Sequence, residues 1–273
     1  MANSKRISAG KATREYLVYW FSGTGNSWLL ARTATAVLRQ QGATVRLIDM
    51  SVGGVVQGSA DQVLVFCYPV YGWGMPRLVA RFINSLPVSN QRAVLIATMG
   101  GEHPGVALAH ARKILSVKGC TVIGARAFTL PNNYPMGRVP KDSERLLAAA
   151  VGDVREFANR VNKEKLLAPE VSLPAYVFSR LANMGFWATL GLSARGFRVT
   201  DKCNGCEYCR RVCPAANIVI EGKLPVWGRK CEQCLRCVQL CPRAAVEFMG
   251  LREGGRPRYR EPSLNPNDFI IRP

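Results

Sequence analysis

The chain has 273 residues, 48% of them hydrophobic, and carries a formal net charge of +19 at pH 7. That length and apolar content suffice for a packed core and exclude a chain that is disordered throughout. The lysines and arginines are scattered without a basic run, which argues against a nucleic-acid-binding protein.

The N-terminal residues 1–14 are basic and polar, and we treat them as an extension. The apolar run that follows, Tyr16–Phe21, is shorter than the roughly 7–15 residues of a signal-peptide core. A transit peptide is the alternative, although nothing resembles a processing site. The uncharged stretch Leu181–Ala194 is shorter than the roughly 18 residues that span a bilayer. We therefore expect a cytoplasmic protein without a transmembrane segment.

Residues 15–165 alternate short apolar runs with helical patterns, as in a parallel sheet covered on both faces. The predicted strands are Tyr16–Phe21, Thr44–Asp49, Gln62–Tyr68, Arg92–Thr98 and Thr121–Leu130. The predicted helices are Ser27–Gln41, Pro76–Ser85, Gly105–Lys118 and Asp142–Lys165. Five strands with intervening helices predict one doubly wound α/β domain.

A short polar loop joins the first strand to the first helix. It reads Ser22, Gly23, Thr24, Gly25, Asn26 and Ser27. Hydroxyls, small residues and backbone N–H groups at a helix N-terminus suit a phosphate. No Gly-Lys-Ser/Thr follows, which excludes a Walker A motif, and Trp28 stands where a dinucleotide fingerprint needs its third glycine. The loop predicts a mononucleotide phosphate site, with a plain connection as the alternative.

Two further segments fall at the carboxyl ends of later strands, where doubly wound sheets bind ligands. They are Pro69-Val70-Tyr71-Gly72-Trp73-Gly74 and Thr98-Met99-Gly100-Gly101. Tyr71 and Trp73 can stack on an isoalloxazine ring, while the glycines let the backbone approach its polar edge. With the phosphate loop they predict an FMN site; the alternative is that both aromatics cap the sheet. Pro131–Tyr134 and His103 are further candidates near the ring.

Residues 166–198 break the alternation and form a connector. Pro169 and Pro174 precede a helical pattern in Tyr176–Leu190, whose apolar side chains include Phe178 and Leu181. We expect this helix to pack the two domains together. A helix on a membrane surface is the alternative, which leaves peripheral membrane contact open.

Eight of the ten cysteines lie between Cys203 and Cys241, and such clustering indicates metal rather than disulfides. Both units of the duplicated segment 199–250 read C-x2-C-x2-C-x3-C-P, the spacing of bacterial two-cluster ferredoxins. The fourth cysteine of each unit completes the other cluster. One [4Fe–4S] cluster is therefore assigned to Cys203, Cys206, Cys209 and Cys241, and the second to Cys231, Cys234, Cys237 and Cys213.

Zinc is the main alternative to the clusters, but tetrahedral zinc sites need two C-x2-C pairs and leave the extra cysteines unexplained. A redox dithiol fits less well, because all eight cysteines are used as ligands. Several cations lie beside the ligands and should raise the cluster potentials, or serve as surface charges or docking contacts. They are Arg210, Arg211, Arg229, Lys230, Arg236 and Arg243. Residues 251–273 are rich in Arg, Pro and Gly, and we expect a basic C-terminal arm over the surface.

The stretch Tyr19–Ser27 and the double cysteine motif resemble the EFR family of flavodoxin–ferredoxin fusions, and the resemblance covers nearly the whole chain. It implies a flavodoxin-like five-stranded parallel sheet of order 2-1-3-4-5, followed by a small α+β ferredoxin-like domain. It also implies FMN, with Ser22 to Ser27 on its phosphate and Tyr71–Trp73 and Met99–Gly101 around its ring, beside two [4Fe–4S] clusters. The basic charge departs from flavodoxins and ferredoxins, which tend to be acidic.

We expect an electron carrier that relays electrons between FMN and the clusters, to or from a redox partner protein with an acidic docking face. One alternative is an FMN-dependent oxidoreductase that acts directly on NAD(P)H or a small substrate, although no second nucleotide motif is present. The other is a docking subunit of a larger complex.

Overall fold

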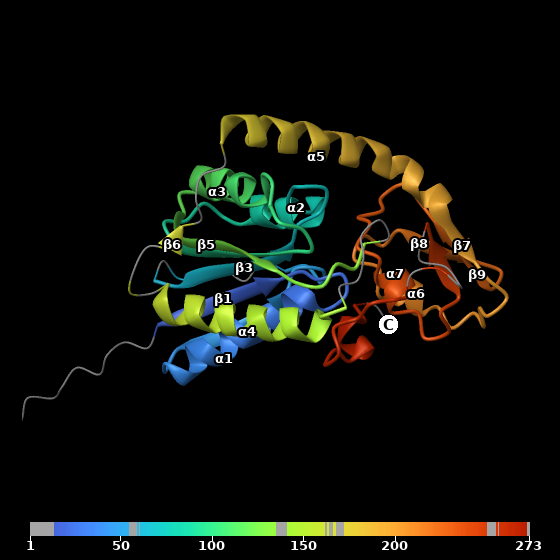
Figure 1. Ribbon diagram of the computed structural model, residues 1–273, viewed down its shortest axis with the longest axis horizontal. Coiled ribbons are helices and arrows are strands. Elements are labelled where there is room, and N and C mark those ends of the chain that lie inside the picture. The colour runs from blue at the N-terminus through green and yellow to red at the C-terminus, as the bar shows by residue number, and fades with distance from the viewer. Residues whose placement is uncertain are drawn as a thin grey trace, which may run out of the picture.

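The computed structural model describes residues 14–54, 59, 61–134, 141–161, 163, 166–167, 172–249, 255 and 257–271. Within them an α/β domain lies beside a smaller cysteine-rich domain (Figure 1). Among the described helices, none combines the length and apolarity that crossing a bilayer requires.

The larger domain is built on a parallel sheet. Its main strands are β1 (Glu15–Trp20), β2 (Thr44–Asp49), β3 (Val63–Pro69), β4 (Arg92–Met99) and β5 (Thr121–Thr129). They follow the order β2-β1-β3-β4-β5, which confirms the predicted flavodoxin-like topology. A two-residue strand that we did not predict, β6 (Leu166–Leu167), pairs with β5 at the edge.

Helices cover both faces of this sheet. The helices α1 (Asn26–Gln40) and α4 (Ser143–Arg160) pack on one face, and α2 (Arg77–Ser85) and α3 (Ala107–Val117) on the other (Figure 1). Successive residues of β1, Leu17 and Val18, belong to the two opposite cores and are both fully buried. The α4 helix ends five residues before the predicted Lys165, which lies outside the described residues.

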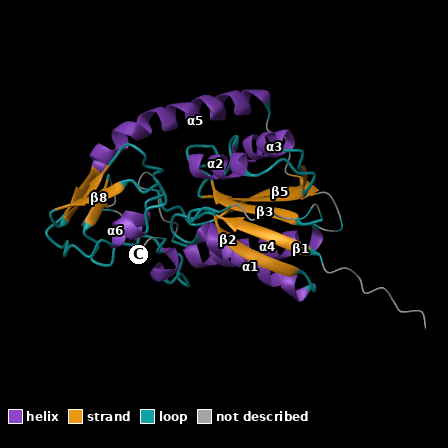
Figure 2. Cartoon of the chain, turned by 180° about the vertical axis from the view of Figure 1, so that it is seen from behind, coloured by secondary structure: helices purple, strands orange, loops and turns teal. Residues whose placement is uncertain are grey.

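The connector helix α5 (Leu173–Ser193) extends beyond the predicted Tyr176–Leu190 at both ends. It runs over α2 and α3 toward the cysteine-rich domain (Figures 1 and 2). On its inner side, the Asn183 amide donates to the backbone carbonyls of Tyr71 and Gly72, at 3.1 and 2.9 Å. The inner face therefore packs on the α/β domain, whereas the outer face stays exposed.

The cysteine-rich domain consists of two antiparallel strand pairs and two short helices. β7 (Phe197–Val199) pairs with β10 (Val246–Phe248), and β8 (Ile218–Glu221) with β9 (Leu224–Trp227). The helices α6 (Tyr208–Arg211) and α7 (Arg236–Gln239) each follow a residue with positive φ, Glu207 at 57° and Leu235 at 59°. The two units thus fold alike, as a duplication predicts.

The C-terminal segment differs from the expected surface arm. In its described part, residues 257–271, Tyr259, Leu264 and Phe269 are buried. The Phe269 ring lies 5.4 Å from Trp20, at the seam between the two domains. The few apolar residues of this tail are spaced among Arg, Pro and Gly, so the sequence showed no periodic pattern.

Candidate functional site

A cavity of about 400 Å³ opens at the carboxyl ends of β1, β3, β4 and β5, within the size range of cofactor pockets. Most of the predicted FMN residues line it. They are Ser22, Gly23, Asn26, Ser27, Pro69, Val70, Tyr71, Gly72, Trp73, Thr98, Met99, Gly100 and Gly101. The looser candidates His103 and 131–134 line it as well.

Two predicted residues of the phosphate loop, Thr24 and Gly25, are not among the residues that line the cavity. The C-terminal tail covers them instead. The backbone N–H of Glu261 donates to the Thr24 carbonyl at 2.9 Å, and a Cβ built on Gly25 would stand 2.6 Å from the Glu261 Cβ. Gly25 also has a φ of 107°, which favours glycine. Their part in the loop is therefore its shape.

Hydrogen bonds tie the phosphate loop to its neighbours. The Ser27 and Thr98 hydroxyls lie 2.7 Å apart, and the Asn26 amide donates to the Pro131 carbonyl at 3.0 Å. The Tyr259 hydroxyl donates to Asn26 Oδ1 at 2.7 Å. Because the loop leads into the 15-residue helix α1, its polar end of the cavity suits an anion such as the phosphate of FMN.

The opposite end of the cavity is aromatic. Tyr71 and Gly74 exchange backbone hydrogen bonds of 2.9 and 3.0 Å around Gly72 and Trp73, whose φ angles of 51° and 60° form a type I′-like turn. Holding Trp73 in this left-handed conformation costs on the order of 1–2 kcal/mol, and the indole stays 47% exposed. An isoalloxazine ring fits between such aromatic and glycine residues.

Several lining residues come from outside the predicted segments. Phe186 belongs to α5, and Gln233, Cys234 and Leu235 belong to the cysteine-rich domain. The Tyr134 hydroxyl donates to Gln233 Oε1 at 2.8 Å across the two domains. No local sequence signal links these residues to the cavity, because only the docking of the two domains brings them there.

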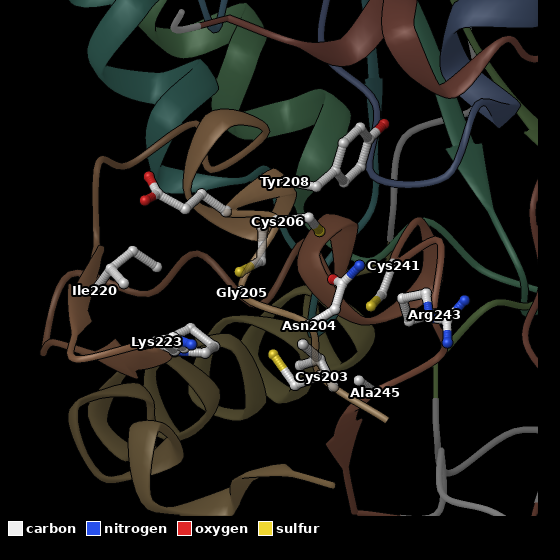
Figure 3. A pocket seen from close by; sticks show the side chains of 14 residues that line it. Cys203, Asn204, Gly205, Cys206, Tyr208, Ile220, Lys223, Cys241, Arg243 and Ala245 are labelled. Carbon is white, nitrogen blue, oxygen red and sulfur yellow. The ribbon is translucent and has the colours of Figure 1, made fainter. Parts of the chain in front are cut away.

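The eight clustered cysteines divide between two further cavities. Cys203, Cys206, Cys209 and Cys241 line the first, the outer cavity; three of their side chains are labelled in Figure 3. Cys213, Cys231, Cys234 and Cys237 line the second, the inner cavity. Each cavity thus takes three cysteines from one unit and the fourth from the other, the grouping that the spacing predicts.

Each group of four cysteines lines one cavity. Tetrahedral zinc would draw four sulfurs to about 2.3 Å from one ion. In the described part of the chain, no three His, Cys, Asp or Glu side chains are arranged to hold a single metal ion. A cubane of iron and sulfide, by contrast, occupies the space between its four thiolates.

The two cysteine cavities differ in exposure. Cys206 of the outer cavity is exposed, whereas Cys213, Cys231 and Cys237 of the inner cavity are buried. Burial raises the pKa of Cys209 to about 11 and that of Cys234 to about 12. These thiols are therefore protonated at neutral pH in the metal-free chain, and ligation of a cluster must displace their protons.

The flavin-type cavity and the inner cysteine cavity share a wall. Cys234 and Leu235 line both of them. A Cβ built on Gly23 would stand 2.4 Å from the Cys234 carbonyl oxygen, so glycine permits this close approach. The proposed cluster ligand Cys234 thus lies directly beside the phosphate loop.

A buried carboxylate anchors the inner cysteine loop to α2. Glu232, with its side chain 2% exposed, accepts hydrogen bonds from Arg81 Nη2 at 2.8 Å and from the backbone N–H of Leu78 at 3.3 Å. Arg77 donates to the Cys231 carbonyl at 3.0 Å. The N-terminal end of a helix favours such a negative charge.

Comparisons with known proteins match different parts of the chain. The model of a 4Fe-4S dicluster domain matches residues 196–242, a segment that holds all eight clustered cysteines. No curated protein matches the chain in a sequence comparison.

Solved structures similar to the chain cover its N-terminal half. A short-chain flavodoxin associated with a non-canonical PDU bacterial microcompartment has 20% identity and a TM-score of 0.40, and covers 55% of this chain and 97% of its own. A flavodoxin from the domain Archaea has 15% identity and a TM-score of 0.39, over 54% and 99%. Rubredoxin oxygen:oxidoreductase from Desulfovibrio gigas has 17% identity and a TM-score of 0.36, over 56% and 38%.

Proposed function

We propose that this chain is an electron-transfer flavo-iron–sulfur protein that relays electrons between FMN and two [4Fe–4S] clusters. The shared wall of Cys234 and Leu235 carries the proposal, because it brings a cluster ligand into the lining of the flavin-type cavity. FMN would supply the conversion between two-electron and one-electron transfer, while each cluster would carry one electron at a time.

Each group of residues has a separate binding role in this proposal. Ser22, Gly23, Asn26 and Ser27 would bind the phosphate, and Tyr71 and Trp73 would flank the ring. Cys213, Cys231, Cys234 and Cys237 would hold the inner cluster beside the flavin. The outer four cysteines would hold the cluster at the protein surface, where Cys206 is exposed.

The partner would meet the outer cluster. Lys223 and Arg243 line the outer cavity and are both exposed. With a net charge of +19 for the whole chain, these cations favour a redox protein with an acidic face. Added salt should then slow the association with that partner, since screening weakens exposed charges.

The composition of protein purified without oxygen tests the proposal. We expect about eight irons and a matching amount of acid-labile sulfide for two [4Fe–4S] clusters, with one FMN per chain and bleaching of the visible spectrum by dithionite. Zinc without sulfide, or a chain without flavin after reconstitution with FMN, would contradict it.

A further inference from the structure

Arg236 is the bulkiest fully buried side chain in the described structure and lies between the two cofactor regions. Its Nε donates to the Ser22 carbonyl of the phosphate loop at 2.8 Å, and Nη2 donates to Ser51 Oγ at 3.0 Å. Asp49 is 3.9 Å from Nη2, longer than a direct hydrogen bond. The guanidinium lies over the ring of Phe269 at 4.5 Å.

The third nitrogen of this guanidinium, Nη1, is buried without a hydrogen-bond partner. Arg236 also lines the inner cysteine cavity. Trp227 lines the same cavity, and its buried Nε1 is a second donor without a hydrogen-bond partner among the described residues. Leaving a buried donor unpaired is unfavourable, so two such donors indicate that acceptors belong in this cavity.

The position of Trp227 supports an acceptor at the ligand sulfurs. The Trp227 indole N–H interacts with the side chain of Cys237, a proposed ligand of the inner cluster. Within the described residues, Trp227 Nε1 makes no full hydrogen bond. The Trp227 ring itself stacks on Phe197 with centroids 4.8 Å apart.

The other cations beside cluster ligands are arranged differently. Arg229, Lys230 and Arg243 are exposed, and Arg210 and Arg211 are half-buried. Solvent screens exposed charges far more than buried ones. Among these six cations, Arg236 would therefore act most strongly on the reduction potential of a nearby cluster.

We propose that Arg236 and Trp227 donate N–H···S hydrogen bonds to the inner cluster and raise its reduction potential, so that the flavin can reduce it. Burial alone disfavours the extra negative charge of a reduced cluster, whereas a buried cation and hydrogen bonds to sulfur favour it. Both residues act as positioning and tuning residues and carry no electrons themselves. The inference rests on the proposed function.

Redox titration of the holoprotein, followed by electron paramagnetic resonance of both clusters, tests this role. We expect Arg236→Met to lower the midpoint potential of the inner cluster by about 59 mV for one electron. The distribution of one electron between the two clusters would then shift about tenfold toward the outer cluster. Arg236→Lys should shift it less, and Trp227→Phe, which keeps the stacked ring, should shift it in the same direction. The exposed control Arg229→Met should leave it unchanged.

The outcomes separate this inference from the proposed function. If the wild-type protein holds both clusters, but Arg236→Lys, Arg236→Met and Trp227→Phe all leave the potential of the inner cluster unchanged, the inference alone is overturned. If Arg236→Met does not retain its clusters, Trp227→Phe and Arg236→Lys decide, because they change less of the packing. Wild-type protein without clusters would overturn both.

A different observation, on the outside of the molecule, concerns α5. Its outer face exposes Leu173, Val177, Phe178, Leu181, Met184 and Leu192, each between 47% and 74%. Their spacing of mostly three and four residues places them along one side of the helix, opposite the inner residues Asn183 and Phe186. The exposed Trp73 on the rim of the flavin-type cavity packs against Phe178 and extends this apolar face. Contiguous apolar surface of this kind marks an interaction site.

The charges around α5 indicate what covers it. Residues 172–200 contain the cations Arg180, Arg195 and Arg198, all exposed, and no Asp or Glu. A second copy of a chain with a net charge of +19 would be repelled, whereas anionic lipid headgroups would be attracted. We infer that the outer face of α5 lies on an anionic membrane surface, with its apolar side chains in the interfacial region.

Vesicle flotation with the full-length holoprotein tests the membrane contact. We expect the protein to float with vesicles of phosphatidylcholine and phosphatidylglycerol, and at least tenfold less with phosphatidylcholine alone or after Leu181→Glu or Met184→Glu. The control Val88→Glu, at a site 75% exposed outside α5, should bind like the wild type.

Three results would overturn this inference. They are absence of vesicle binding, binding that Leu181→Glu and Met184→Glu leave unchanged, and a solution dimer that Leu181→Glu dissociates, because a second copy would then cover the face. None depends on the redox activity, so the proposed function would stand in each case.

Discussion

Cys213 shows how single residues define the proposed centres. It belongs to the first cysteine unit along the chain but lines the inner cavity with three cysteines of the second. Cys241 exchanges in the opposite direction. The spacing rule predicted this exchange from the sequence, because a three-residue gap after a tight loop points the fourth cysteine away.

Pairs of cysteine substitutions test the exchange. Cys213→Ala with Cys234→Ala removes two ligands from the same proposed cluster and should cost about four irons per chain. Cys213→Ala with Cys206→Ala removes one ligand from each cluster and should cost about eight. Iron and sulfide analysis of anaerobically purified protein gives the answer, and the reverse pattern would show that each unit holds its own cluster.

Gly23 is the residue on which the close contact of the two domains depends. Gly23→Ala would place a methyl group 2.4 Å from a backbone oxygen, which cannot move as a flexible side chain would. We expect a loss of about 1–3 kcal/mol in the free energy of unfolding, with weaker FMN retention. Urea unfolding and flavin content measure both effects.

The matched control for that change is Gly152→Ala in α4, where an added Cβ meets no atom within 4 Å. Alanine there should leave FMN bound and stabilise the helix by up to about 1 kcal/mol. Equal behaviour of the two variants would show that Gly23 does not need to be glycine.

At the scale of elements, the N-terminal end of α2 holds the inner cysteine loop through Glu232. Glu232→Gln removes the charge but keeps the shape of the side chain. Because hydrogen bonds to charged groups contribute about 1.5–3 kcal/mol, we expect a loss near the lower end of that range, since Arg81 is 62% exposed. Thermal unfolding should show it together with faster loss of iron.

The exposed pair Glu156 and Arg160 on α4 provides the comparison. Glu156→Gln should change stability by only about 0.3–0.5 kcal/mol, as is usual for such helix pairs. A Glu232 variant that behaves like this control would mean that the loop is held by packing alone.

The elements also show what the sequence could predict. Each of the five main strands and each of the helices α1 to α4 begins within two residues of its predicted start, because apolar periodicity and flanking glycines mark these elements clearly. The strand β6 was missed, because two residues carry no periodicity. The end of α4 was predicted five residues too late. The prediction that the tail forms a surface arm was wrong, because only the contact between the two domains provides a place where Leu264 and Phe269 can be buried.

At the scale of the whole molecule, the tail holds the two domains together. Phe269 packs against both Trp20 and the Arg236 guanidinium. We expect Phe269→Ala to lower the free energy of unfolding by about 3–5 kcal/mol, as for a buried aromatic elsewhere. Denaturant unfolding measures this, with the exposed Val88→Ala as control. A change below about 1 kcal/mol would mean that the tail is not packed there.

The docking of the domains was beyond the reach of sequence reasoning. The phosphate loop, the aromatic segment and all eight cysteines could be found by motif and spacing, yet the wall of Cys234 and Leu235 arises only when two separate folds meet. The same holds for Arg236, which the sequence presented as one of six similar cations. Its burial between the cofactor regions sets it apart.

Transfer between flavin and clusters within one chain is the central claim, and flash photoreduction of the holoprotein tests it most directly. After a light pulse reduces the flavin, the cluster absorbance should bleach in a first-order process whose rate constant does not change with protein concentration. A rate proportional to protein concentration, or a reduced flavin that passes no electrons to the clusters, would contradict the account.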